Sequence, residues 1–190
     1  MKKSLAHMKF IASITIIACL LLAAIIVRAG EPSIITRDYI QEELKLSDDQ
    51  KQTLQKKLPD YVKDSGAQEK LWAFLKETLN AEQFKRFQQL ELQHEGPPAL
   101  FRPEIAKELK ITDEQRQQFM GLIQEMQMKI QPLMKESKSA GNPEKLEEFR
   151  LKVIKLRQDC LGKMAALMSD AQKKQWQEMT GKPFDTLRHH

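Results

Sequence analysis

Few side chains in this sequence could bind a metal, and they are scattered. His94 lies close to Glu91 and Glu95, and one imidazole with two carboxylates could hold zinc. The same spacing is typical of a solvated helix end, which is the interpretation we favour. Copper or silver binding by methionine is not expected either, because no Met-x-x-Met cluster with a nearby His is present. We therefore predict no metal site.

Patterns typical of an enzyme are also missing from the sequence. It has no Gly-rich phosphate loop, no His-Glu-x-x-His motif, and no Ser or Cys nucleophile with a plausible base. Cys160 lies on an apolar helical stripe, which favours a buried and inert thiol. A disulfide between two chains is the alternative in an oxidising compartment. We predict no catalytic residues and no cofactor.

Methionines are concentrated in the second half of the chain. Flexible thioethers suit a surface that contacts many apolar partners. The seven residues are Met120, Met126, Met128, Met134, Met164, Met168 and Met179. Met126, Met134 and Met164 fall on or beside apolar stripes, so we expect them to fill the core. Met120 and Met128 lie nearer the flanks and are our candidates for contact with clients.

A five-residue motif begins four of the helices that would position these side chains. Each copy has an apolar residue, then Ser, Thr or Asn, then two residues, then Gln. In a capping box the first polar side chain accepts a backbone N–H of the new helix, and the Gln reaches back to the N-cap N–H. We therefore assign helix-capping roles to Leu46, Ser47, Gln50, Leu79, Asn80, Gln83, Ile111, Thr112, Gln115, Met168, Ser169 and Gln172.

Apolar residues recur at helical spacing and no window alternates with period two, so the sequence predicts an all-α fold without a sheet. Two long apolar stripes should face each other in a helical hairpin. They are Phe119, Leu122, Ile123, Met126, Ile130 and Leu133, followed by Leu146, Phe149, Val153, Leu156, Cys160, Met164 and Leu167. Pro59 is expected to end or kink its helix and Pro132 to kink the long one. A further capping box is predicted at residues 65–68.

The sequence contains an internal duplication. Residues 40–52 align without a gap on residues 105–117, and the second motif aligns with the fourth. We therefore predict two tandem helical modules, 30–96 and 97–184, the second with the longer hairpin, between a leader (1–29) and a flexible tail (185–190). One hairpin cannot bury its apolar stripe alone, so the modules should pack on each other or on a second chain.

The leader has the pattern of a secretory signal peptide. Lysines precede an apolar run over residues 10–27, and Val27 and Ala29 fit a signal-peptidase site. An uncleaved anchor and a lipoprotein linked through Cys19 stay open. All three place the remaining chain in the periplasm or cell envelope. The net charge of +5 comes largely from four basic residues of the leader, which argues against nucleic acid as a partner.

Four motifs of the L-T-x-x-Q type behind a signal peptide, in a helical chain, resemble the Spy/CpxP family of periplasmic proteins. The resemblance covers residues 38–60, 68–125 and 160–184. Residues 89–93, 96–100 and 181–184 are also similar to a broader group of envelope proteins with such repeats. Members of the family have two motifs and this chain has four, of which only one keeps the Thr, at Thr112. The resemblance implies a cradle-like or bundle-like helical fold, often dimeric.

The function implied by this resemblance is that of an ATP-independent chaperone or envelope-stress accessory protein. Its partners would be unfolded or apolar protein clients, bound on a helical surface. A regulatory or metal-responsive partner of an envelope signalling protein is the first alternative, and a structural helical envelope protein is the second. Membrane contact is expected only through an uncleaved N-terminal segment, and a homodimer is compatible with each function.

Overall fold

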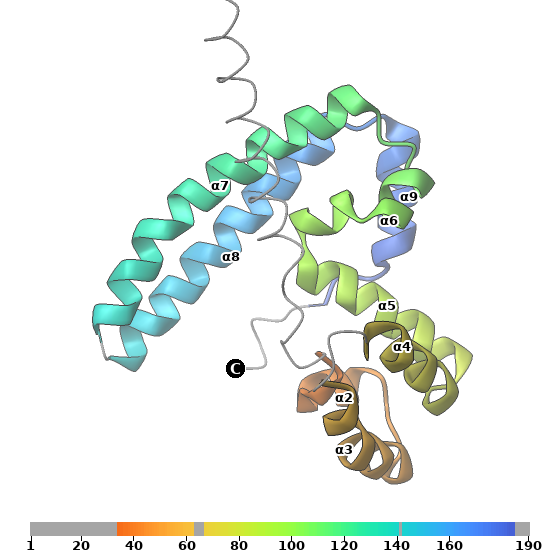
Figure 1. Ribbon diagram of the computed structural model, residues 1–190. Helices are drawn as coiled ribbons and strands as arrows, with labels where there is room; N and C mark the ends of the chain where they lie inside the picture. The colour runs from red at the N-terminus through yellow and green to blue at the C-terminus, as the bar shows by residue number, and fades with distance from the viewer. Residues whose placement is uncertain (1–33, 63–66, 141, 185–190) are drawn as a thin grey trace, which may run out of the picture. The chain divides into compact units, whose positions relative to one another are not determined.

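The structure is a computed structural model that describes residues 34–62, 67–140 and 142–184. Every regular element in these ranges is a helix, and they contain no strand (Figure 1). The prediction of an all-α fold is therefore confirmed. Within the same ranges, no helix combines the length and apolar character needed to cross a membrane. The leader (1–29) and the tail (185–190) lie outside the described residues. So do the first two positions of the capping box that is predicted at residues 65–68.

The chain forms two compact units, Met1–Phe84 and Lys85–His190, which divide within helix α5 (Ala81–Glu95). The modules predicted from the duplication, 30–96 and 97–184, divide at the end of the same helix instead. The boundary between the modules, after residue 96, describes the repeat in the sequence and stays a prediction.

The first unit is a set of short helices around a small core. Its described elements are η1 (Ile34–Thr36), α2 (Asp38–Glu43), α3 (Asp48–Val62), α4 (Ala67–Thr78) and the first turn of α5. Helices α3 and α4 pack on each other, with Leu54 and Leu75 fully buried. The ring of Tyr61 stacks on Phe74 with the two centroids 5.0 Å apart, an offset arrangement that favours close contact between α3 and α4.

The second unit contains a long hairpin on a compact base. Its elements after α5 are η2 (Pro97–Phe101), α6 (Pro103–Glu108), α7 (Asp113–Ala140), α8 (Pro143–Ala166) and α9 (Asp170–Thr180). Helices α7 and α8 lie side by side as the hairpin (Figure 1). Asn142 caps α8 by accepting the N–H of Glu144 at 2.9 Å. The base is filled by Phe87, Leu100, Leu109, Phe119, Ile123 and Met164.

Neither internal proline ends its helix. Helix α3 continues past Pro59 to Val62, and α7 runs through Pro132 to Ala140. Both prolines are exposed. A proline removes one backbone hydrogen bond and crowds the carbonyl four residues earlier. On the solvent-facing side of a helix, water can donate a hydrogen bond to that carbonyl. The lost backbone hydrogen bond is then partly replaced, and the helix continues past the proline. Of the two outcomes expected at Pro59, an end of α3 is wrong, and the kinks at Pro59 and Pro132 stay predictions.

Candidate functional site

All four motifs form a reciprocal capping pair. In the third motif, Gln115 N donates to Thr112 Oγ1 and Thr112 N donates to Gln115 Oε1, both at 3.1 Å. The same two hydrogen bonds occur between Ser47 and Gln50, Asn80 and Gln83, and Ser169 and Gln172. The polar motif side chains are thus engaged with backbone atoms at the start of α3, α5, α7 and α9.

The glutamines of the motifs also pair with each other within each unit. In the second unit, Gln115 Nε2 donates to Gln172 Oε1 at 2.9 Å, and Gln172 Nε2 donates to Gln115 Oε1 at 3.0 Å. Gln115 Nε2 reaches Leu167 O at 2.9 Å, and Gln172 Nε2 reaches Leu109 O at 3.0 Å. We call this reciprocal pair, with the carbonyls that it holds, a glutamine joint.

The first unit has an equivalent joint. Gln50 Nε2 donates to Gln83 Oε1 at 2.8 Å and to Thr78 O at 2.9 Å, and Gln83 Nε2 donates to Leu44 O at 3.2 Å. The loop before each joint passes through the left-handed region, with φ of 51° at Lys45 and 53° at Lys110. These residues align in the duplication. The motif residues therefore build a repeated structural joint.

Away from the base, the α7–α8 hairpin carries large apolar side chains that the described residues of the second unit leave exposed. We call residues 127–159 of the hairpin the arm. No described side chain of the arm is buried, whereas Met126 and Cys160 at its two ends are. Large apolar side chains are exposed on both helices: Met128 by 67%, Met134 by 43%, Leu146 by 58% and Leu151 by 46%. Exposed large apolar side chains are candidates for contact with apolar partners.

Polar pairs flank this apolar surface. Glu125 accepts hydrogen bonds from Lys129 at 2.7 Å and from Lys163 at 3.2 Å, and these bonds lower the pKa of the Glu125 carboxyl. Along α8, Arg150 pairs with Glu147 at 2.6 Å. Such exposed pairs add little stability. They add charges of both signs to α7 and α8, a composition that does not select one sign of partner.

The predicted methionines occupy different environments. Met128 is the most exposed large apolar residue of the described chain, and Met120 is half-buried at the base of α7. Met126 and Met164 are buried in the core as expected. The expectation for Met134 is wrong, since 43% of it is exposed. Leu146 was also expected on a buried stripe and is exposed, because the stripe continues beyond the elements that could cover it.

Cys160 and His94 have structural surroundings. Cys160 is 4% exposed, its Sγ lies 3.6 Å from Leu122 O, and burial raises the pKa of its thiol. A disulfide to a second chain would need this sulfur at the surface. The carbonyl of His94 accepts Arg157 Nη2 at 2.6 Å. In the described ranges, no three or more His, Cys, Asp or Glu side chains gather as a metal site would require.

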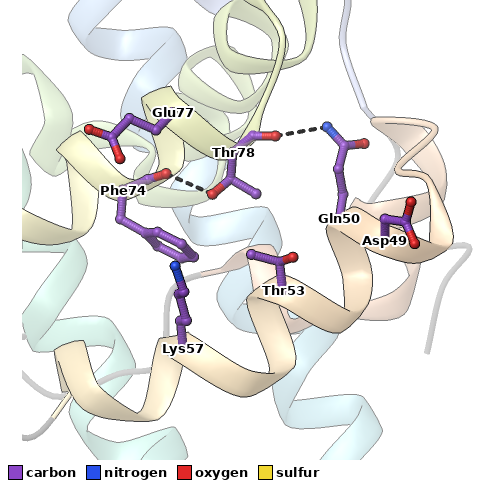
Figure 2. A pocket seen from close by; sticks show the side chains of 7 residues that line it. All are labelled: Asp49, Gln50, Thr53, Lys57, Phe74, Glu77 and Thr78. Atoms are coloured by element: carbon purple, nitrogen blue, oxygen red, sulfur yellow. Dashed lines mark hydrogen bonds between the residues drawn. The ribbon is translucent and has the colours of Figure 1, made fainter.

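A small open hollow lies between α3 and α4 of the first unit (Figure 2). Its volume is about 320 Å³. Lys57 Nζ lies 5.7 Å from the centroid of the Phe74 ring on its wall, and Thr78 Oγ1 donates to Phe74 O at 2.8 Å. The other lining residues are Asp49, Gln50, Thr53 and Glu77. Its charges are mixed and Lys57 already faces the ring, so we assign the hollow no ligand.

The chain matches no protein-family model, no curated protein and no solved structure in the three comparisons made. The candidate site therefore depends on the geometry of the chain itself.

Sequence reasoning missed the residues that join helices across long separations. The Gln–Gln contacts were not anticipated, although four glutamines at the same motif position are a signal for them. Arg157, which donates to His94 O and Glu95 O at the end of α5, was not singled out. Gln93 has no such signal beyond its place in the stretch 89–93, yet it contacts Thr180 O at the end of α9 and Lys182 O and Phe184 N beyond it.

Proposed function

We propose that this protein is an exported, ATP-independent chaperone of the cell envelope that binds apolar segments of unfolded clients on its arm. The observation that supports this most is the exposure of four large apolar side chains on α7 and α8: Met128, Met134, Leu146 and Leu151. A folded protein without a partner for such a surface would expose it at a cost in solubility. The leader and the motif pattern are consistent with export to the cell envelope.

The chemistry of the arm suits clients of varied sequence. Methionine is unbranched and polarizable, so it adapts to apolar groups of different shapes. The surrounding charges of both signs keep the arm soluble and favour no single client charge. Such a surface would hold apolar segments that an unfolded chain exposes and release them without a nucleotide.

We also infer that the two glutamine joints derive from one ancestral helical module that is present twice in tandem. The equivalent hydrogen bonds and the aligned left-handed lysines support this inference. A duplicated chain could then provide within one molecule what a two-motif protein provides as a dimer.

The direct test is suppression of aggregation. A client denatured in guanidinium is diluted into buffer with increasing amounts of this protein, and light scattering is followed. We expect suppression at about equimolar ratio by the wild type. Replacing Met128, Met134, Leu146 and Leu151 together by Ser should abolish it. If the wild type suppresses no aggregation, or the quadruple variant is as active as the wild type, the proposal fails.

A matched control is available on the same two helices. Gln118, Gln124, Gln131 and Gln158 are exposed and polar, so replacing all four by Ser changes as many positions without removing apolar surface. This control should keep full activity. Both variants should keep the helical content of the wild type in circular dichroism.

A second copy of the chain is the competing occupant of the arm. Sedimentation of the wild type and of the quadruple Ser variant distinguishes self-association from client binding. Loss of a dimer in the variant without any client effect in the wild type would favour self-association through the arm over client binding.

A further inference from the structure

One face of α5 holds the segment that follows α9. Arg86, Gln89 and Gln93 are spaced three and four residues apart, so they lie along the same side of the helix. All three approach the stretch from Thr180 to Phe184, within the second unit. These contacts join residues about ninety positions apart in sequence. Helix α9 directly precedes the contacted segment.

Gln93 uses both ends of its carboxamide on this segment. Its Nε2 donates to Thr180 O at 2.6 Å and to Lys182 O at 2.9 Å, and its Oε1 accepts Phe184 N at 2.8 Å. Arg86 Nη1 donates to Lys182 O at 2.9 Å. Each of these bonds goes to a backbone atom of the segment. The face therefore recognises the path of a peptide backbone more than the side chains on it.

Gly181 is the position where side-chain identity matters. Its φ is 64°, in the region that favours glycine. A Cβ built there would collide with the carboxamide of Gln89. The next residue but one is Pro183, which has no N–H and so leaves no unpaired donor beside the helix. Gly at the closest approach and Pro two residues later fit this face for separate physical reasons.

The segment can be released without unfolding its neighbours. Hydrogen bonds from the α5 side chains Arg86 and Gln93 hold residues 182–184. Helix α9 is anchored at its other end by the glutamine joint at Gln172. Loss of the segment would therefore be a local opening.

We propose that Arg86, Gln89 and Gln93 form a peptide-binding site for a non-helical Gly-Lys-Pro-Phe segment, which the chain fills with its own residues 181–184. When its own segment is displaced, the site accepts the same segment from a second copy of the chain. The ligand class is a glycine-containing backbone that offers the carbonyl of its Lys and the N–H of its Phe to the face. The residue before the Gly adds a second carbonyl, as Thr180 does here.

The test uses NMR on the full chain. In the wild type, exchange of the Phe184 N–H with solvent should be slow, and Gln93→Ala should accelerate it by about tenfold or more. Gln88→Ala is the matched control, because Gln88 is an exposed residue of α5 next to the face. In Gln88→Ala, the Phe184 N–H should exchange as slowly as in the wild type. Equal exchange in Gln93→Ala and the wild type would overturn the proposal.

The second arm of the test adds the ligand in trans. Gly181→Ala should weaken the hold on the resident segment, because alanine is strained at a φ of 64° and its Cβ would meet the Gln89 carboxamide. A blocked synthetic peptide, Thr-Gly-Lys-Pro-Phe, should then shift the side-chain amide resonances of Gln93 saturably, with an affinity about tenfold above that for the wild type. A peptide with Ala in place of Gly should cause no shift. Equal binding of the two peptides, or equal binding to the two chains, would refute the site. If Gly181→Ala does not fold, the peptide is titrated into the wild type at high concentration, and the absence of a saturable shift at Gln93 would refute the site.

Discussion

Gln115 and Gln172 donate to each other's carbonyl oxygens at 2.9 and 3.0 Å, although each also caps the helix on which it lies. Each Oε1 accepts its own N-cap N–H and the amide of its partner. One residue type thus performs a local and a long-range task at once. The energetic consequences of the two tasks can be separated by mutation.

Gln172→Ala should destabilise the protein more than Thr112→Ala. The first change removes a cap together with the contacts to Gln115 and Leu109 O, and we expect a loss of about 2 kcal/mol. The second removes one cap acceptor, for about 1 kcal/mol. Urea unfolding measures both free energies. Gln177→Ala, an exposed change on α9, is the control, and a cost for Gln172→Ala no greater than for the control would contradict the joint.

The two glutamines of one joint should be energetically coupled. In a double-mutant cycle of Gln115→Ala and Gln172→Ala, we expect a coupling energy of about 0.5 kcal/mol or more, because each change removes the partner of the other. Gln50→Ala combined with Gln172→Ala pairs residues of different joints and should be additive. Additivity within the joint would show that the mutual contact contributes no stability.

Glu95→Gln should stabilise the protein at neutral pH. Burial raises the pKa of the Glu95 carboxyl, and Arg102 at 3.3 Å compensates only in part. A carboxyl with a raised folded pKa binds its proton more tightly when folded, so stability falls as pH rises from the ordinary Glu value through the folded pKa. The gain from Gln should be present at pH 7 and shrink below about pH 4.5. Melting temperatures at both pH values measure it.

Glu104→Gln should change the stability at pH 7 in the opposite direction, so it is the control for Glu95→Gln. Burial raises the pKa of Glu104, but hydrogen bonds from its backbone N–H and from Arg102 at 2.7 Å outweigh it, and the net pKa is lowered. Stability from this carboxylate is present above the ordinary Glu pKa and is lost as pH falls through the folded value. Glu104→Gln should therefore destabilise slightly at pH 7. Equal signs for the two variants would contradict the assignment.

Cys160 should react slowly with thiol reagents in the native protein. Its side chain is buried, and burial raises the pKa of the thiol, so little thiolate is present or accessible. In a chain with Cys19 replaced by Ser, labelling by a disulfide reagent should accelerate sharply across the urea transition. Rapid labelling without urea would place the sulfur at the surface.

The helices could be predicted from the sequence because their signals are local. The capping pair of Thr112 and Gln115 lies within four residues, and Gly96 ends α5 with a φ of 66°. The contact between Gln115 and Gln172 could not be derived in this way, because it depends on how distant helices pack. Periodicity also identified the stripe containing Leu146 without revealing that nothing in the described chain covers it.

The two joints close segments of unequal length with the same hydrogen bonds. Gln50 and Gln83 are 33 residues apart, whereas Gln115 and Gln172 are 57 apart. The closure therefore does not depend on how long the intervening hairpin is. Insertions or deletions of matched length in α7 and α8 would change the reach of the hairpin while the joint at its base is kept, so hairpin length is a quantity that evolution or an engineer can vary separately from the fold.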